Sequence, residues 1–204
     1  MNDPPEPRRS RWSGAVGPLV LLLAAASFGS VAVGTLIPSE AERELSAFVP
    51  SAERPDPSTA IPGIEIEPVD ADDVPTDRNG PPVDGPLGTG YAACDGVAYP
   101  DPVRDTDAVG SMARGAVWIT YDPARTAPTT VAALAASRVT DADQLMMSPY
   151  PGLDTPISLQ AWGHRLALDS PDDPRFEQFI RALSDNPYTA PAADAGCAPG
   201  GPER

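Results

Sequence analysis

The feature that most constrains this chain is an uncharged stretch near its beginning. No Asp, Glu, Lys or Arg occurs between Arg11 and Glu40, and the segment from Gly17 to Ile37 is mostly apolar. A single α-helix needs about 20 such residues to cross the hydrocarbon core of a bilayer. We therefore expect residues 15–37 to form one uncleaved transmembrane helix.

Charged residues on the two sides of this segment give it a direction. Arg8, Arg9 and Arg11 precede the segment, whereas acidic residues follow it. Positively charged residues collect on the cytoplasmic side of membrane segments. We therefore expect a single-pass protein of the cell membrane, with residues 1–14 in the cytoplasm and the C-terminal part outside.

A cleaved signal peptide is the alternative interpretation of the same segment. Its apolar core would lie near residues 18–23, and the three alanines at 24–26 would form the cleavage signal. The mature chain would then begin at Ser27. Both interpretations export the rest of the chain, so they differ in attachment and not in compartment.

The exported part is strongly acidic. All 14 basic residues of the chain are arginines, and residues 38–204 carry 11 of them against 27 Asp and Glu, a net charge of −16. Such a surface repels the phosphates of nucleic acids and of anionic lipids. We expect no nucleic acid as a partner, and the acidic excess favours solubility.

The two cysteines of the chain, Cys94 and Cys197, both belong to the exported part. Thiols outside the cytoplasm are usually oxidised, so we predict one disulfide between them. Closing a loop of on the order of 100 residues stabilises a domain by roughly 4–5 kcal/mol in the chain-entropy model. A redox-active pair would need the C-x-x-C spacing, which these cysteines lack.

The residues after the apolar segment predict a short helix and then a stalk. Ser39 and Glu42 have the spacing of a capping box, which indicates a helix beginning there. From Val49 to Gly85 the chain is rich in Pro, Asp and small residues, a composition with too little apolar surface to order a compact unit. We expect a juxtamembrane helix and linker over residues 38–60.

The compact domain is predicted over residues 61–198, with a disordered tail over 199–204. Residues 115–122 are a continuous β-branched and aromatic run, typical of a strand buried on both faces. Residues 144–150 and 156–162 are two more strands joined by a Pro-Gly turn, and we expect them to be antiparallel neighbours.

Two helices complete the predicted domain. Residues 128–138 form a short one, and residues 172–187 place Phe176, Phe179, Ile180 and Leu183 on one face of a longer one. Its cap is Asp172 or Asp173, with Pro174 at a permitted early position. The fold class is α+β, a small mixed sheet with two packed helices, preceded by a transmembrane helix and a Pro/Asp-rich stalk.

Catalytic chemistry finds little support in the sequence. His164 is the only histidine, it follows a predicted strand, and no G-x-S-x-G motif accompanies it. We expect it to face solvent in a loop, and we expect no catalytic residues and no cofactor. Three sets of neighbouring aspartates could bind calcium, but none has the residue order of an EF-hand loop. The sets are Asp70, Asp72 and Asp73; Asp105 and Asp107; and Asp141 and Asp143.

A partner groove is the one binding site that the residues suggest. Tyr150 and Trp162 flank the Pro-Gly turn, and grooves that bind partners are often lined by such loops with aromatic residues. Core packing is the alternative for these aromatic residues. The partner itself, an envelope protein or a ligand, is not identified by these residues.

Several segments, taken in order, resemble the actinobacterial branch of the family called domain of unknown function 3105. The resemblance covers roughly residues 61–198 and is most specific from Ser148 to Gly163. Members of the family resemble single-pass membrane or exported proteins whose biochemical activity is not established. The matching segments are PPVDGP at 81–86, Cys94 with GVAY and PVR after it, GAVWITYDP at 115–123, SPYPGLDTPISLQAWG at 148–163, LALDSPDDPRFEQFIRAL at 166–183, and Cys197.

The resemblance also shows a departure from the family pattern. Family members typically carry H-S-L-E-H-G before the bulky strand and a histidine further upstream, a set that suits a divalent metal. The corresponding positions here are Leu87, Gly110, Ala113 and Arg114, none of which is a metal ligand. The resemblance therefore implies a non-catalytic binding or structural module without the family's histidine site. The alternative is a metal-binding or metal-dependent envelope protein that uses its aspartates.

Overall fold

The computed structural model of the chain describes residues 38–69, 80–86 and 90–197. The apolar segment predicted to span the membrane, the residues before it and the tail over 199–204 lie outside the described residues. No helix within the described ranges is long and apolar enough to cross a membrane. The chain divides into two units, Met1–Arg43 and Glu44–Arg204, and the second unit contains the sheet.

Helix α2 (Glu40–Leu45) begins at the predicted capping box. The backbone N–H of Ser39 donates to Glu42 Oε2 over 2.7 Å, and the N–H of Glu42 donates to Ser39 Oγ over 3.2 Å. These hydrogen bonds lower the pKa of the Glu42 carboxyl. The reciprocal pair confirms the sequence prediction for this helix start.

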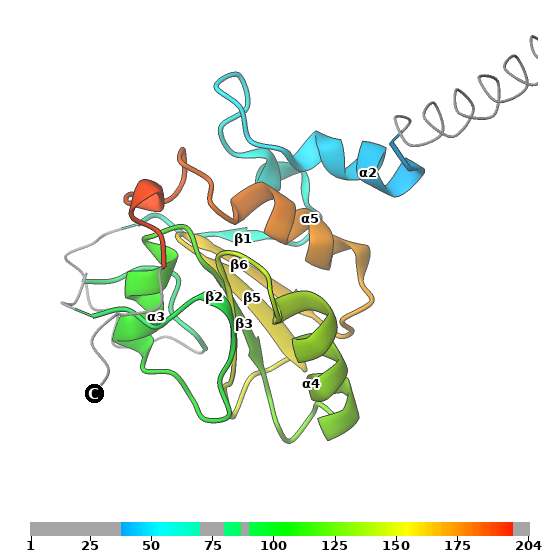
Figure 1. The fold of residues 1–204 in the computed structure, drawn as a ribbon, viewed down its shortest axis with the longest axis vertical. Coiled ribbons are helices and arrows are strands. Elements are labelled where there is room, and N and C mark those ends of the chain that lie inside the picture. The colour runs from blue at the N-terminus through cyan, green and yellow to red at the C-terminus, as the bar shows by residue number, and fades with distance from the viewer. Residues whose placement is uncertain (1–37, 70–79, 87–89, 198–204) are drawn as a thin grey trace, which may run out of the picture. The chain divides into compact units, whose positions relative to one another are not determined.

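The second unit is built on a six-stranded mixed sheet (Figure 1). The strands lie in the order β1-β6-β5-β3-β4-β2, which places the bulky strand β3 near the centre. All five residues of β3 are buried, as the sequence predicted for a strand covered on both faces. The strands are β1 (Glu65–Ile66), β2 (Asp95–Ala98), β3 (Val117–Tyr121), β4 (Leu145–Pro149), β5 (Ile157–Ala161) and β6 (His164–Leu168).

The strand pairing differs from the prediction at one point. Strand β3 lies between β4 and β5, parallel to β4 and antiparallel to β5, so the two strands joined by the Pro-Gly turn are not neighbours. The loop between them crosses the end of β3. There the N–H of Tyr150 donates to Tyr121 O over 2.8 Å, and the N–H of Asp122 donates to Pro156 O over 3.0 Å.

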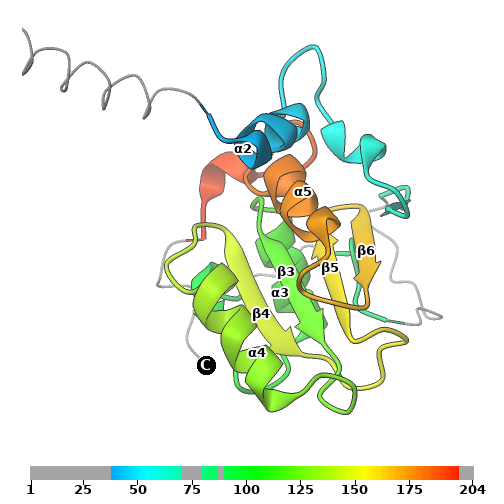
Figure 2. The same cartoon turned by 90° about the vertical axis from the view of Figure 1, so that its right-hand side faces the viewer.

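Helices cover both faces of the sheet, as Figures 1 and 2 show. Helix α4 (Pro128–Leu134), continued by the π-helical turn η3 (Ala135–Val139), and helix α5 (Pro174–Leu183) pack on one face, which Figure 2 presents to the viewer. Helix α3 (Asp105–Met112) packs on the other face with Trp118. Three helices therefore replace the two that were predicted.

Helix α3 is the element that sequence periodicity missed. Its first turn is acidic and its face toward the sheet contains Ala108, Val109 and Met112, a short pattern interrupted by Gly110. These residues are buried because the sheet supplies the apolar partner surface. Tertiary packing, which no local pattern shows, stabilises this helix.

Part of the predicted stalk is packed inside the second unit. We name residues 55–62 the strap; they contain the short helix η2 (Pro57–Ala60). Ser58 and Ile61 of the strap are buried, and Ile61 belongs to the hydrophobic core on the α5 side. We predicted that residues 49–85 form a stalk without packed structure, and this is wrong for the strap. Ile61 supplies apolar surface there, although the segment as a whole has few apolar residues.

Cys94 and Cys197 form the predicted disulfide. Their Cα atoms lie 5.3 Å apart, both residues are buried, and 103 positions separate them in the sequence. The bond joins the segment before β2 to the residues after helix η4 (Ala193–Ala195). It thereby fixes the C-terminal segment on the α3 side of the sheet, where both cysteines belong to the core.

Candidate functional site

The positions where the resemblance expects metal ligands lie at the end of α3 and in the turn after it. Gly110 packs directly on the backbone of Gly90: a Cβ at position 110 would lie 2.5 Å from Gly90 O and 3.3 Å from Tyr91 Cβ. Any side chain here would displace that segment. Protein backbone occupies the space that an imidazole at position 110 would need.

Arg114 fills the neighbouring part of the same region. Its guanidinium carbon lies 4.2 Å from the centroid of the Tyr91 ring, and Nη1 donates to the carbonyls of Ala195 and Gly196 over 3.5 and 3.4 Å. A permanent cation at this position opposes the binding of a metal cation. Arg114 instead holds the segment that leads into Cys197.

Backbone hydrogen bonds from the same turn extend this anchoring. The N–H of Ala192 donates to Ala113 O over 2.8 Å, and the N–H of Asp185 donates to Gly115 O over 2.9 Å. Gly115 has a φ of 93°, a conformation that favours glycine. Residues 113–115 thus bind the chain's C-terminal segment in the structure. Leu87, the remaining position of the resemblance, lies outside the described residues.

The acidic sets do not converge on a common point in the described part of the chain. Within those residues, no group of three or more His, Cys, Asp or Glu side chains is arranged to hold a metal ion. Asp107 pairs with Arg104 Nη2 over 2.6 Å. Asp141, with a φ of 63°, belongs to the turn before β4. Asp70, Asp72 and Asp73 lie outside the described residues.

The two aromatic residues of the predicted groove have different environments. Trp162 is buried in the core on the α3 side, so it lines no groove. Tyr150 is half-buried; its ring meets Trp118 edge-on at a centroid distance of 5.8 Å and also lines an open pocket of about 690 Å³. Tyr150 and Pro151 line this pocket, and Trp162 is not among its lining residues; a partner groove stays a prediction.

Arg165 also lines this groove, together with the acidic residues Glu65 and Asp154. Its Nη2 donates to Pro81 O over 2.7 Å and lies 3.3 Å from Glu67 Oε1, and its Nη1 lies 3.6 Å from Glu65 Oε2. The two carboxylates neutralise the guanidinium. Burial raises the pKa of Tyr150, so its phenol remains a hydrogen-bond donor at neutral pH.

The floor of the groove belongs to a polar patch on the same sheet face. Trp118 Nε1 donates to Ser148 Oγ over 3.0 Å, and Thr120 Oγ1 donates to Ser158 O over 3.0 Å. Gln160 Nε2 donates to Ser158 Oγ over 2.5 Å. These buried groups satisfy one another, so they fix the shape of the sheet face beneath the groove.

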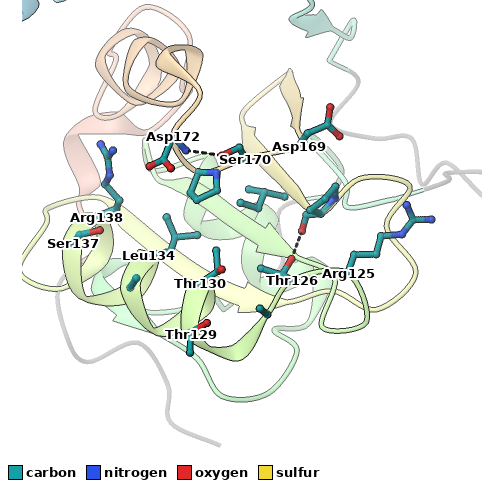
Figure 3. A pocket seen from close by; sticks show the side chains of 15 residues that line it. Arg125, Thr126, Thr129, Thr130, Leu134, Ser137, Arg138, Asp169, Ser170 and Asp172 are labelled. Carbon is teal, nitrogen blue, oxygen red and sulfur yellow. Dashed lines mark hydrogen bonds between the residues drawn. The ribbon is translucent and has the colours of Figure 1, made fainter.

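A second pocket, of about 640 Å³, lies between α4 and the loop that joins β6 to α5 (Figure 3). Hydroxyls of Thr129, Thr130 and Ser137 line its helical side. Arg138 pairs with Glu177, and Arg125 Nη1 donates to Asp154 O over 3.0 Å. Sequence analysis did not identify this pocket, because no local pattern brings α4 to the loop before α5.

His164 does not face solvent, which corrects the sequence expectation. It begins β6, is 6% exposed, and its Nε2 lies 3.1 Å from Asp56 Oδ2 of the strap. Ser58 Oγ donates to Asp56 and not to the imidazole. Within the described part of the chain the imidazole contacts Trp162 O and Asp56 Oδ2 and no hydroxyl, so its arrangement with Ser58 and Asp56 is not a catalytic triad.

Comparison with known families gives one match over much of the chain. A family model described as protein of unknown function (DUF3105) matches residues 75–199. The matched range includes both cysteines, β2 to β6, α3 to α5 and the residues of the Tyr150 groove apart from Glu65. No curated protein and no solved structure matches the chain.

Proposed function

The chain belongs to the DUF3105 family of proteins of unknown function, and from that premise we propose that it is a single-pass membrane protein with an outward-facing, non-catalytic binding or structural domain. In this proposal residues 15–37 span the membrane, residues 1–14 lie in the cytoplasm and residues 61–198 form the exported domain. In the sequence, the strap (residues 55–62) follows the apolar segment and leads into the domain.

The disulfide between Cys94 and Cys197 carries the proposal. Cytosolic proteins keep their thiols reduced, whereas exported proteins retain disulfides. A disulfide that closes most of a folded domain supports export of that domain. The arginines before the apolar segment and the acidic residues after it support the orientation.

Reporter fusions test the export and the orientation together. Alkaline phosphatase, which is active only outside the cytoplasm, is fused after Arg204 in one variant and after Gly14 in the other. The proposal predicts activity for the first fusion and none for the second. An inactive Arg204 fusion at normal expression would contradict export.

N-terminal sequencing of the purified protein separates an anchor from a cleaved signal peptide. The proposal predicts a chain that keeps its arginine-rich start and fractionates with membranes. If the chain begins at Ser27 and appears in the soluble fraction, the result would agree with export of the domain but would contradict the membrane anchor.

The groove beside Tyr150 supports a binding role. It combines the Tyr150 ring and Pro151 with the guanidinium of Arg165, which is paired with two carboxylates, and both Pro151 and Asp154 are exposed. The polar groups on its floor are already paired with one another, so they position a surface and do not form a nucleophile–base pair. These features suit recognition more than chemistry.

Site-specific photo-crosslinking in cells tests the binding role. A photoreactive residue replaces Pro151 at the groove or Asp101, an equally exposed residue outside it, as the matched control. The proposal predicts one discrete adduct from position 151 that is absent from position 101. Equal labelling from the two positions, or none from either, would contradict a role for the groove.

A further inference from the structure

The only histidine of the chain joins the strap to the sheet. His164 Nδ1 lies 2.6 Å from Trp162 O, and Nε2 lies 3.1 Å from Asp56 Oδ2. The imidazole is buried at the start of β6, and Asp56 precedes η2 in the strap. One contact between two ionisable groups therefore links positions 108 residues apart.

The partners of the imidazole determine how many protons the pair holds. A carbonyl only accepts hydrogen bonds, so Nδ1 must carry a proton to approach Trp162 O. The contact between Nε2 and Asp56 Oδ2 needs a second proton, since two lone pairs facing each other repel. The closed arrangement thus holds one proton more than a neutral imidazole beside a carboxylate.

The hydrogen bonds to Asp56 assign that extra proton to the imidazole. Asp56 Oδ1 accepts from the N–H of Ser58 over 3.0 Å and from Ser58 Oγ over 2.5 Å, and both bonds favour an ionised carboxylate. Burial raises the pKa of Asp56, but the hydrogen bonds from His164 and Ser58 outweigh it and lower the pKa overall. The closed pair is therefore an imidazolium facing a carboxylate.

The other contacts of the strap respond little to pH. Asn186 Nδ2 donates to Pro55 O over 3.0 Å, Arg175 Nη1 donates to Pro62 O over 3.1 Å, and Ile61 packs in the core. An amide, a guanidinium and an aliphatic side chain do not change charge near neutral pH. The histidine–aspartate pair is the strap contact that can.

Three neighbouring segments carry charged groups. Asp84 is buried beside Val83, whose O accepts from the N–H of Gly163 over 2.8 Å. Arg175 pairs with Asp173 at the start of α5, and Arg165 of β6 pairs with Glu65 and Glu67 at the sheet edge. Ile66, opposite His164 on β1, is apolar. Asp56 is therefore the charged partner that faces the imidazole from the strap.

We propose that His164 and Asp56 form a proton-operated latch, which holds the strap closed while the pair keeps its shared proton and releases Asp56 when that proton is lost. Loss of the proton leaves a lone pair of Nε2 against the Asp56 carboxylate in a buried site. This repulsion opens the N-terminal part of the strap against the hydrogen bond from Asn186 Nδ2 to Pro55 O. Residues 58–62 remain held by Arg175 and Ile61.

In the sequence, Asp56 of the latch lies between the apolar segment and the strands of the sheet. Opening of the latch would lengthen the connection between the two, a consequence that rests on the proposed membrane anchor. The latch itself needs no membrane, so its test on the purified full chain can fail or succeed whatever the outcome of the reporter fusions.

Hydrogen–deuterium exchange of the full chain from pH 6 to pH 9, corrected for intrinsic rates, tests the opening. We expect the opening of residues 50–58 to increase about tenfold or more over this range while β3 stays protected. Asp56→Asn removes the carboxylate and should abolish the pH dependence. Asp101→Asn, the same change at an exposed position, should preserve it.

Nitrogen NMR of the single histidine gives a readout that does not depend on the folding of a variant. While the strap is protected we expect two similar protonated imidazole signals, which become one protonated and one unprotonated nitrogen as the strap opens. A neutral imidazole in the protein with a protected strap would overturn the latch. Protection of residues 50–58 that is independent of pH, or a pH dependence that survives Asp56→Asn, would also overturn it.

Discussion

The guanidinium of Arg114 stacks on the ring of Tyr91, 4.2 Å from its centroid, and donates to two carbonyls just before Cys197. The contact joins the turn before β3 to the end of the disulfide loop. It gives the position a structural role in this chain, where the resemblance to the family expects a metal ligand. The region is closed by packing and not prepared for a cation.

Gly110→Ala tests that packing. Alanine is favoured over glycine inside a helix by about 1 kcal/mol, but a methyl group at position 110 would meet Gly90 O at 2.5 Å. We expect the clash to dominate and to lower the free energy of unfolding by about 1–3 kcal/mol, measured by urea denaturation. Ala132→Gly, at an exposed position of α4, measures the difference in helix propensity between alanine and glycine without a clash. An increase in stability on Gly110→Ala would show that the backbone of residues 90–91 yields easily.

Chelation should leave the protein unchanged. No metal-binding group of three or more side chains is present within the described ranges, and a ligand that binds only the folded state raises its melting temperature by mass action. We expect identical melting curves in EDTA, in calcium and in zinc. A melting temperature that falls in EDTA and recovers with one divalent ion would favour the aspartate-based metal site instead.

In the structure the N-cap of helix α5 is Asp173 and not Asp172. Asp173 Oδ1 accepts from the N–H of Arg175 over 2.9 Å, and its carboxylate also binds the Arg175 side chain. Asp173→Ala should cost about 1 kcal/mol of unfolding free energy. Asp172→Ala, one position earlier and exposed, should change it by less than about 0.5 kcal/mol. Equal effects of the two substitutions would contradict the assignment.

We expect the Asp56 carboxylate to make the free energy of unfolding depend on pH in the acidic range. Its pKa is lowered in the folded state, so the stability it provides is present above the unfolded-state value of about 3.9 and is lost as pH falls through the folded-state value. At pH 6 we expect Asp56→Asn to cost about 1–2 kcal/mol. This difference from the wild type should shrink below about pH 4 in urea titrations. A difference that stays constant down to pH 2.5 would exclude the carboxylate charge as its cause.

The sequence predicted those elements that depend on residues close together in the chain. The capping box of Ser39 and Glu42, the bulky run that became β3 and the apolar spacing that became α5 are confirmed. Each depends on side chains within a few positions. The disulfide was predictable too, because the chain has only two cysteines.

Long-range pairing was not predictable in the same way. The insertion of β3 between β4 and β5 depends on the crossover through α4, and strand β6 depends on β5 as its partner. The burial of His164 depends on Asp56, which the composition of its surroundings assigned to a stalk. For the groove, sequence reasoning identified Tyr150 but not Arg165, whose role follows from its contacts with Pro81 and two glutamates.

The redox state of Cys94 and Cys197 in cells tests the central claim most directly. Cells are quenched in acid, the protein is denatured, and free thiols are labelled with a maleimide polymer that shifts its mobility in a gel. An exported, disulfide-closed domain predicts no shift without reductant, a double shift after reduction, and a single shift for Cys197→Ser without reductant. Two labelled thiols in the untreated protein would contradict both the disulfide and the export that it supports.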